Sequence, residues 1–316
     1  MRSQNAWTGT GFALACLVLL GVMPIISNSR PAASSALTFA VFLSLWQLLF
    51  SLPLLLAGLA AKTPRHRGIF AAHLGWDVKR RTIAVILGTG MIFGLSTFTY
   101  VFAVEKAGAV SAAIAMQSYP LFAILLETLF LKRRKSALEL LFTLTLMISL
   151  TYLATGGTWS VKGLSGWLLL ALSIPFMWSV AHIIVREVMG RTPITPAQIT
   201  FFRVLISALF LGAVLLIAEG PGAFAAALQD RHFQSAALVM GLVYYLELIF
   251  WFYAIRSIDV SLASSITIPW PALTMVLAVI FLGEPVATYQ IVTFVLVAAS
   301  IYGLMFAATR KANPAS

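Results

Sequence analysis

Apolar residues occur along this chain in runs of about 20, divided by short polar segments, without the alternation typical of half-buried strands. A helix needs about 20 mostly apolar residues to cross the hydrocarbon of a bilayer. The pattern therefore predicts an all-α polytopic membrane protein with ten transmembrane helices. We expect these spans at residues 8–28, 36–60, 82–104, 109–131, 136–156, 163–186, 196–218, 235–257, 260–282 and 286–308.

The first run has a second interpretation. Arg2 precedes it and the small residues "AASSA" follow it, which is also typical of a secretory signal peptide. The chain contains an internal repeat, described below, in which the first predicted span corresponds to the sixth. Removing the first span would leave the sixth without a counterpart, so we favour a helix that remains in the chain.

Composition excludes an ordinary soluble domain. Hydrophobic residues make up 60% of the chain, charged residues 10%, and the mean hydropathy is +0.96, whereas soluble proteins carry about 25% charged residues. The net charge of +11 would suggest a nucleic-acid partner in a soluble chain. Here the basic residues lie in short runs between apolar segments, so we expect a lipid bilayer as partner and no nucleic acid.

The basic residues also predict the topology. With the N-terminus inside, 16 of the 21 Lys and Arg residues fall on the cytoplasmic side and 4 on the other, while Arg203 lies within a span. Cytoplasmic loops carry such an excess. We therefore expect a multi-pass protein of the cell (inner) membrane with both termini cytoplasmic. The run "KRRK" at 132–135 is then a topology anchor, and the linker 62–81 a basic segment along the membrane surface.

The sequence contains no pattern typical of a metal or cofactor site. Cys16 is the only cysteine, and there is no Cys/His metal spacing, Gly-rich phosphate loop or His-Glu-x-x-His motif. An enzyme would need a nucleophile with a base, or a metal cluster, facing one pocket. We therefore expect no metal, no cofactor and no enzymatic activity.

The two halves of the chain correspond at an offset of 151 residues. This shift lays residues 90–153 over 241–304 and places Tyr119 on Trp270. Each half holds five predicted spans, and because five is odd the second half must cross the membrane in the opposite sense. Inverted repeats of this kind build many secondary transporters, with the binding site near the midplane. We expect repeats at 1–156 and 157–316, forming one compact transmembrane domain around a central cavity.

Prolines lie in the middle of the fourth and ninth spans. Pro269 and Pro271 belong to "ITIPWPALTM", and Pro120 is the counterpart of Pro271 at the same offset. Proline lacks an N–H group and kinks or opens a helix, which leaves carbonyls that a water-lined cavity satisfies and lipid does not. We expect the three prolines to break the central helices, with Tyr119 and Trp270 facing each other across a substrate path.

These features, with "SYPLFAILLETLFLKRR" in the fourth span and "IPWPALTMVLAVIFLGEPVATYQ" in the ninth, resemble the EamA-like exporters of the drug/metabolite transporter superfamily. Gly283, Glu284 and Pro285 match that family's "LGE" signature and polar turn. The first half departs from it, with "LKRRK" in place of "LGE" and Gln47 where many relatives are basic. The resemblance implies alternating access around a central cavity and export of amino acids or other small metabolites, often driven by protons.

Glu247 is the leading candidate for a binding residue. It is the thirteenth residue of its 23-residue span, near the bilayer centre, where ionisable groups are costly and typically functional. Met240, Tyr244 and Trp251 share its helix face. A carboxylate among aromatic rings attracts a substrate ammonium or carries a proton. The alternative is a structural glutamate bonded to a neighbouring helix.

Arg203 is predicted to lie at a similar depth, eight residues into its span. It would either pair with Glu247 or bind the carboxylate of an amino acid whose ammonium Glu247 binds; snorkelling toward the cytoplasm is the alternative. His182 lies near that level and either takes part in proton coupling or is hydrogen-bonded at a helix end. The full set of expected substrate-binding residues is Glu247, Arg203, Tyr119, Trp270, Tyr244, Trp251, Gln117 and Trp178.

Several other polar or aromatic residues have a less defined role. Trp178 faces either the cavity or lipid. Glu127 lies beside the "KRRK" run and is expected to balance it, while Glu105 and Glu284 fall at outer helix ends that water reaches. The small-residue pair Gly90 and Gly94 is typical of close helix packing.

The sequence predicts a secondary active transporter that exports small amphipathic metabolites by alternating access, with proton coupling as an option. Amino acids or related amines are the preferred substrates. A multidrug exporter of hydrophobic cations is the alternative, followed by a membrane-embedded enzyme or a lipid-handling protein. The partners are then a small-molecule substrate and the bilayer, with the protein a monomer or homodimer.

Overall fold

The computed structural model describes residues 2–31, 34–60, 68–70, 75–119, 121–122, 125–126, 136–160, 165–257, 263 and 266–312. All regular structure in these residues is helical, which confirms the predicted class. The helices are α1 (Arg2–Asn28), α2 (Ala36–Ala60), the 3₁₀ turn η1 (Gly68–Phe70), α4 (Trp76–Ala107), α5 (Ala109–Met116), α7 (Ala137–Ala154), α8 (Gly166–Arg191), α9 (Pro196–Ala218), α10 (Gly220–Gln229), α11 (Arg231–Ser257), α13 (Trp270–Leu277), the π-helix η3 (Ala278–Leu282) and α14 (Thr288–Ala312).

Six helices in the described ranges are long and apolar enough to cross a membrane. Three shorter apolar helices accompany them, at Leu140–Leu153, Trp270–Leu282 and Thr288–Leu304. The six are Trp7–Asn28, Ala36–Ala60, Trp76–Ala107, Gly166–Val185, Pro196–Ala218 and Arg231–Ala254. A protein with several membrane-spanning helices is therefore supported, while the number ten stays a prediction.

Some helices extend beyond the predicted apolar runs. Residues 76–81 were expected to belong to a segment along the membrane surface, but they form the first turns of α4. Lysine and arginine are good helix formers, so a basic stretch continues a helix that an apolar run begins. The rest of the expected surface segment falls outside the described residues except Gly68–Phe70, where Ile69 N donates to Gln198 Oε1 at 3.1 Å.

We divide the six long helices into two groups of three by their contacts with α11 and with α4. In the α1 bundle, α11 packs against α1 and α2, and in the α4 bundle, α4 packs against α8 and α9. Contacts between α2 and α9 join the two bundles. Helices α5 and α13 contact each other, and they pack against α8 and α1 respectively. Helices α7 and α14 form a separate pair.

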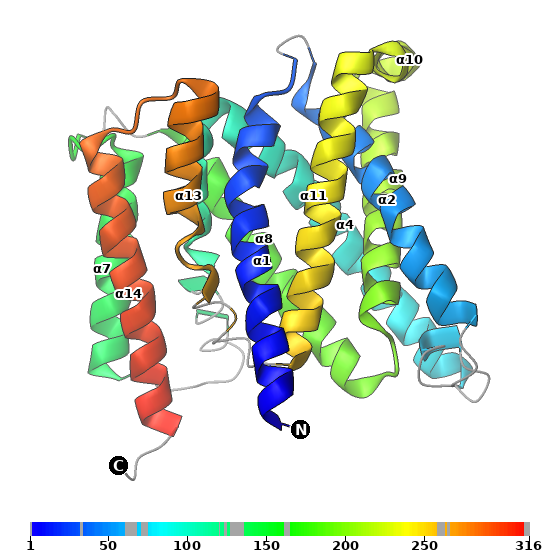
Figure 1. Ribbon diagram of the computed structural model, residues 1–316, viewed down its shortest axis with the longest axis horizontal. Helices are drawn as coiled ribbons and strands as arrows, with labels where there is room; N and C mark the ends of the chain where they lie inside the picture. The colour runs from blue at the N-terminus through cyan, green and yellow to red at the C-terminus, as the bar shows by residue number, and fades with distance from the viewer. Residues whose placement is uncertain are drawn as a thin grey trace.

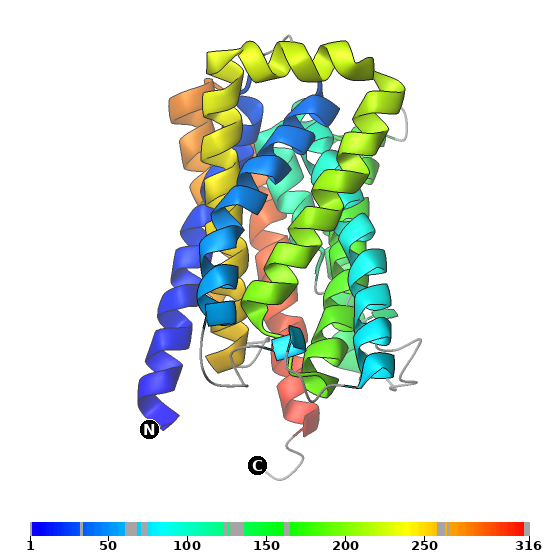
Figure 2. The same ribbon diagram turned by 90° about the vertical axis from the view of Figure 1, so that its right-hand side faces the viewer.

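Both termini lie at the same end of the molecule, here called the terminal end (Figure 1). Helix α10 lies across the opposite end, called the far end, roughly at right angles to its neighbours (Figure 2). The far end includes Arg30, Glu105 and Glu219. Placement of both termini at one end agrees with an even number of crossings.

Glycines let the helices within each bundle approach closely. A Cβ on Gly90 of α4 would lie 2.7 Å from Ile206 of α9, and Ser207 Oγ donates to the Gly90 carbonyl at 2.9 Å. The close packing expected at Gly90 and Gly94 is therefore confirmed. Gly241 of α11 has the same role, because a Cβ there would lie 2.8 Å from the carbonyl oxygen of Leu43 in α2.

Two helices are interrupted near the centre of the molecule. Before α13 the chain turns at Ile268 and Pro269, and Ala272 N donates to Pro269 O at 3.0 Å instead of bonding four residues back. Helix α5 ends at Met116, after which Gln117 N donates to Ile114 O at 3.1 Å. The interruption before α13 coincides with Pro269 and Pro271. Pro120 lies outside the described residues, and so do Glu127 and the "KRRK" run.

Candidate functional site

A cavity lies between the two bundles, bordered by the interruptions of α5 and α13. About 100 Å³ of it is open to the centres of water-sized molecules, which is room for several waters. Its lining residues come from six helices and the two interruptions: Leu20, Met23, Met116, Gln117, Tyr119, Trp178, His182, Arg203, Tyr244, Glu247, Leu248, Trp251, Thr267, Ile268 and Trp270.

The structure brings together residues that the sequence separates widely. All eight expected substrate-binding residues line this cavity, and so does His182. Trp178, which was expected to face either cavity or lipid, faces the cavity, and its Nε1 donates to Ser96 Oγ at 3.2 Å. Pro269 and Pro271 do not line the cavity. The binding roles of the lining residues stay predictions.

Sequence reasoning missed six lining residues. Leu20, Met23 and Leu248 are apolar residues within apolar helices, so no local signal distinguishes them. Met116, Thr267 and Ile268 have a usable signal, because they lie immediately beside the two helix interruptions.

Arg203 is buried in the cavity wall. The residue is 6% exposed, and its guanidinium carbon lies 3.4 Å from the centroid of the Phe93 ring. This stacking is a cation–π contact. Its Nη1 atom has no hydrogen-bond partner. The snorkelling alternative is therefore wrong, because the guanidinium faces the interior of the protein.

Glu247 lies across the cavity from Arg203, on the other bundle. Its carboxylate makes no hydrogen bond or ion pair with the described residues; it interacts electrostatically with Arg203 over more than ion-pair distance. The neighbouring helix α1 bonds only to its backbone, where Cys16 Sγ donates to Glu247 O at 3.4 Å. In the described residues the Glu247 side chain thus has no bond to a neighbouring helix and no direct ion pair with Arg203, and its role stays a prediction.

His182 and Tyr244 add further polar atoms. The His182 ring lies 5.2 Å from the Phe93 ring and 5.9 Å from the Tyr119 ring, and neither of its nitrogens has a hydrogen-bond partner. It lies inside α8, so the expected hydrogen bond at a helix end is wrong. The Tyr244 hydroxyl lies near Arg203 and Thr97 but meets hydrogen-bond geometry with neither.

These unpartnered groups define the chemistry of the cavity. A buried donor or acceptor without a partner costs about 1–3 kcal/mol, so three such side chains at one place are a strong sign that water or a ligand completes them. Arg203 and Tyr244 offer donors, and Glu247 offers a charged acceptor. The arrangement suits a small polar molecule with an anionic group on one side and a cationic or donor group on the other.

One hydrogen bond joins the two helix interruptions. Gln117 Nε2 donates to the carbonyl of Ile268 at 2.9 Å, from α5 to the turn before α13. Nearby, Ser179 Oγ of α8 donates to the Tyr119 carbonyl at 3.1 Å. The backbone beside the cavity is thus fixed by side chains and not by helical hydrogen bonds alone.

Glu284 has a structural partner that the sequence did not reveal. It was expected to meet water, but its carboxylate accepts from the backbone N–H groups of Ala109 and Val110, at 3.2 and 3.4 Å. These groups begin α5, where a helix leaves donors unsatisfied and favours negative charge. Gln290 adds a bond from Nε2 to Ser111 Oγ at 3.0 Å. The "LGE" segment therefore holds the start of the interrupted helix α5.

Comparison with known proteins agrees with this architecture. No curated protein matches the chain. A solved structure titled "Crystal structure of protein" is similar in fold, with a TM-score of 0.64 and 16% identity over 98% of this chain and 100% of that one. Residues 165–306 match the model of the EamA-like transporter family, part of the drug/metabolite transporter superfamily. The second half of this chain therefore matches the EamA-like transporter family, in agreement with the resemblance seen in its sequence.

Proposed function

We propose that this protein is a secondary active transporter that moves a small amphipathic metabolite through the central cavity by alternating access. The family match indicates a membrane transporter and not an enzyme. The observation that carries the proposal is the pair of opposite charges, Arg203 on the α4 bundle and Glu247 on the α1 bundle, without direct contact across one cavity.

The helix packing supports an inverted repeat as the basis of alternating access. At an offset of 151, α4 corresponds to α11 and α7 to α14, while the order of helices equates α1 with α8 and α2 with α9. If each helix is replaced by its counterpart, the contact between α1 and α11 becomes one between α8 and α4. The contact between α2 and α11 likewise becomes one between α9 and α4. All four contacts occur. Two structurally equivalent bundles flanking one site are typical of inverted-repeat transporters.

Individual residues follow the same offset. Gly90 and Gly241 differ by 151, and each brings its helix close to the partner within its bundle. Gln117 and Ile268 also differ by 151 and hydrogen-bond to each other. A contact between two corresponding residues is expected where a twofold axis passes through a molecule. Both observations support a twofold relation that passes between α5 and α13.

The charges favour a substrate that carries both a carboxylate and an ammonium group, as an amino acid does. The Arg203 Nη1 atom without a partner suits a carboxylate oxygen. Glu247, near the rings of Trp251 and Tyr244, suits an ammonium group. Because each group belongs to a different bundle, such a substrate would connect the bundles. Export and proton coupling are part of this proposal by family analogy.

A multidrug exporter of hydrophobic cations is the second candidate. One carboxylate with five Tyr and Trp side chains in the same cavity would attract a cation. Arg203 would repel that cation, so the two candidates differ in their dependence on this residue. A zwitterion should require Arg203, whereas a cation should bind Arg203→Ala at least as well as wild type.

The test begins with purified protein in detergent or liposomes. Thermal unfolding is measured with amino acids, nucleosides and organic cations, because a ligand that binds the folded state raises apparent stability. Flux of the stabilising compound is then compared in wild type, Glu247→Gln and Arg203→Ala. Thr151→Val is the matched control, since Thr151 is exposed and its hydroxyl bonds only within α7. Full flux in folded Glu247→Gln would remove the central claim.

A further inference from the structure

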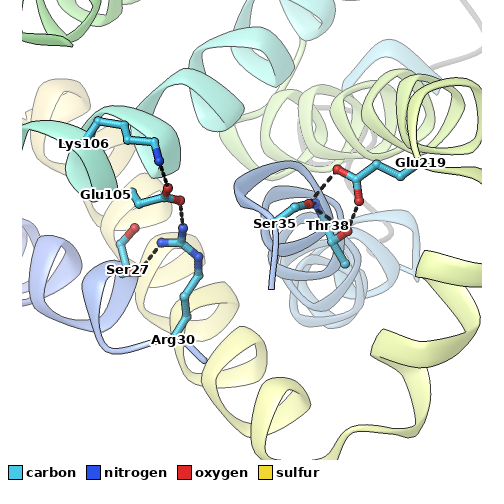
Figure 3. Close-up of polar contacts among 7 residues, drawn as sticks. All are labelled: Ser27, Arg30, Ser35, Thr38, Glu105, Lys106 and Glu219. Atoms are coloured by element: carbon cyan, nitrogen blue, oxygen red, sulfur yellow. Dashed lines mark hydrogen bonds and ion pairs between the residues drawn. The ribbon is translucent and has the colours of Figure 1, made fainter. Parts of the chain in front are cut away.

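The two bundles are joined by side chains at the far end. In the described residues, polar side-chain contacts between the bundles cluster there in two places (Figure 3). The first is the ion pair between Arg30, in the loop after α1, and Glu105, near the end of α4. Since α1 and α4 belong to different bundles, this ion pair crosses from one bundle to the other.

Arg30 is held firmly for a loop residue. It is 9% exposed, its Nη1 donates to the Ser27 carbonyl at 2.9 Å, and its guanidinium carbon lies 5.8 Å from the Phe39 ring centroid. Burial lowers the pKa of Arg30 from its usual value, and the charge of Glu105 opposes that shift. Removing one partner of a buried ion pair leaves an uncompensated charge, which is strongly unfavourable. The buried position of Arg30 between the bundles therefore depends on Glu105.

The second contact is made by Glu219, where α9 meets α10. Its carboxylate accepts hydrogen bonds from Ser35 Oγ at 2.7 Å and from Thr38 Oγ1 at 2.9 Å. Ser35 precedes α2 and accepts from Thr38 N at 2.9 Å, so Glu219 lies at the start of that helix. Helix α9 is in the α4 bundle and α2 is in the α1 bundle. A second carboxylate thus joins the same two bundles.

Among the residues that the structure describes, no equivalent contact is found at the terminal end. The charged cavity residues are nearer to that end: Arg203 is seven residues after Pro196 and Glu247 ten residues before Ser257, which is about 10 and 15 Å along their helices. No ion pair between the bundles occurs there in the described ranges. The residue 151 positions after Glu105 is Arg256. The position that corresponds to Glu105 in the second half of the chain is therefore basic and cannot be the acidic partner of such an ion pair.

We propose that the Arg30–Glu105 ion pair and the Glu219 contact with Ser35 and Thr38 form a gate, the far-end gate, which closes the cavity on that side. Opening toward the far end requires the two bundles to separate there, so both contacts must break. In this structure both contacts are made, so this conformation is the one in which the far-end gate is closed. This inference rests on the proposed transport by alternating access.

The test measures access to the cavity and needs no substrate. In a Cys16→Ala background, Leu20→Cys places a single thiol in the cavity lining. A membrane-impermeant methanethiosulfonate is added from either side of oriented vesicles, with the side established by cleavage of a C-terminal tag. Labelling from the far-end side should be slow with the gate intact. Glu105→Gln combined with Glu219→Gln should speed it at least ten-fold, equal to about 1.4 kcal/mol.

Two controls make the result specific. Lys106→Gln should leave far-side labelling unchanged, because Lys106 contacts Glu105 at 2.7 Å from the neighbouring position of the same helix and joins no two bundles. The exchange Arg30→Glu with Glu105→Arg should return labelling toward the wild-type rate. If the carboxylate variants do not fold, Thr38→Val and Ser35→Ala test the second contact alone and should speed labelling less.

The outcomes separate the gate from the transport function. Far-side labelling that stays within about two-fold of wild type in every folded gate variant overturns the gate, whatever the flux assays show. Faster labelling in the gate variants, together with no flux or ligand stabilisation for any compound, supports the gate and counts against transport. Equal labelling from both sides in wild type would show that the far end is not closed, and would also overturn the gate.

Discussion

The hydrogen bond between Gln117 and Ile268 makes a sharp prediction about stability. Gln117 is 7% exposed, and its Nε2 lies 2.9 Å from the Ile268 carbonyl. In a continuous helix that carbonyl would accept from Ala272 N, but Ala272 N bonds to Pro269 O at 3.0 Å. The Gln117 amide therefore replaces a helical donor. Gln117→Met removes this amide while keeping an unbranched side chain of similar length.

The expected loss follows from what remains after the substitution. Leaving a buried carbonyl without its partner costs about 1–3 kcal/mol, compared with about 1 kcal/mol for the net value of an average hydrogen bond. In chains of 150–250 residues, each kcal/mol of unfolding free energy corresponds to about 2–4 °C in Tm. Gln117→Met should therefore lower the Tm by several degrees.

The assay is thermal unfolding of the purified protein, followed by tryptophan fluorescence in one detergent. Thr151→Val is the control, because Thr151 is exposed and its hydroxyl bonds only to Met147 O within α7. Such surface changes are worth about 0.5 kcal/mol or less. A Tm for Gln117→Met equal to that of the control would refute the view that this amide holds the two interruptions together.

Two further predictions concern the start of α5 and the space beside two helical glycines. Glu284→Ala removes the acceptor for the first N–H groups of α5 and should cost about 0.5–2 kcal/mol of unfolding free energy, measured by the same thermal assay; Glu284→Gln should retain part of it. Gly241→Ala should destabilise by about 1–3 kcal/mol, because its Cβ would meet the Leu43 carbonyl at 2.8 Å. Gly212→Ala, with nothing within 4 Å, should instead stabilise by about 0.5–1 kcal/mol. A reversed order of the two glycine variants would contradict the packing described.

The helical class was readable from sequence because a membrane imposes a simple rule on apolar runs. The exact helix ends were not, since the basic residues 79–81 extend α4 beyond its apolar run without changing its hydrogen bonding. The break before α13 was readable from Pro269 and Pro271, because proline removes a helical donor whatever surrounds it.

The cavity could be predicted only in part. Glu247 and Arg203 stood out because a charge within a span is costly and demands a reason. Leu20 and Met23 carry no such signal, since one apolar residue in an apolar helix looks like another. Pairings were also hidden: Arg30 and Glu105 are 75 residues apart, and no local pattern indicates which charges meet.

The Gln117–Ile268 contact also provides a fixed reference for measuring motion. If the two halves exchange conformations about a twofold axis, atoms on that axis keep their positions while atoms far from it move most. Spin labels near residues 117 and 268 should then report one constant separation throughout a transport cycle. Labels near Arg30 and Glu105 should report two separations, so the first pair calibrates the second within the same molecule.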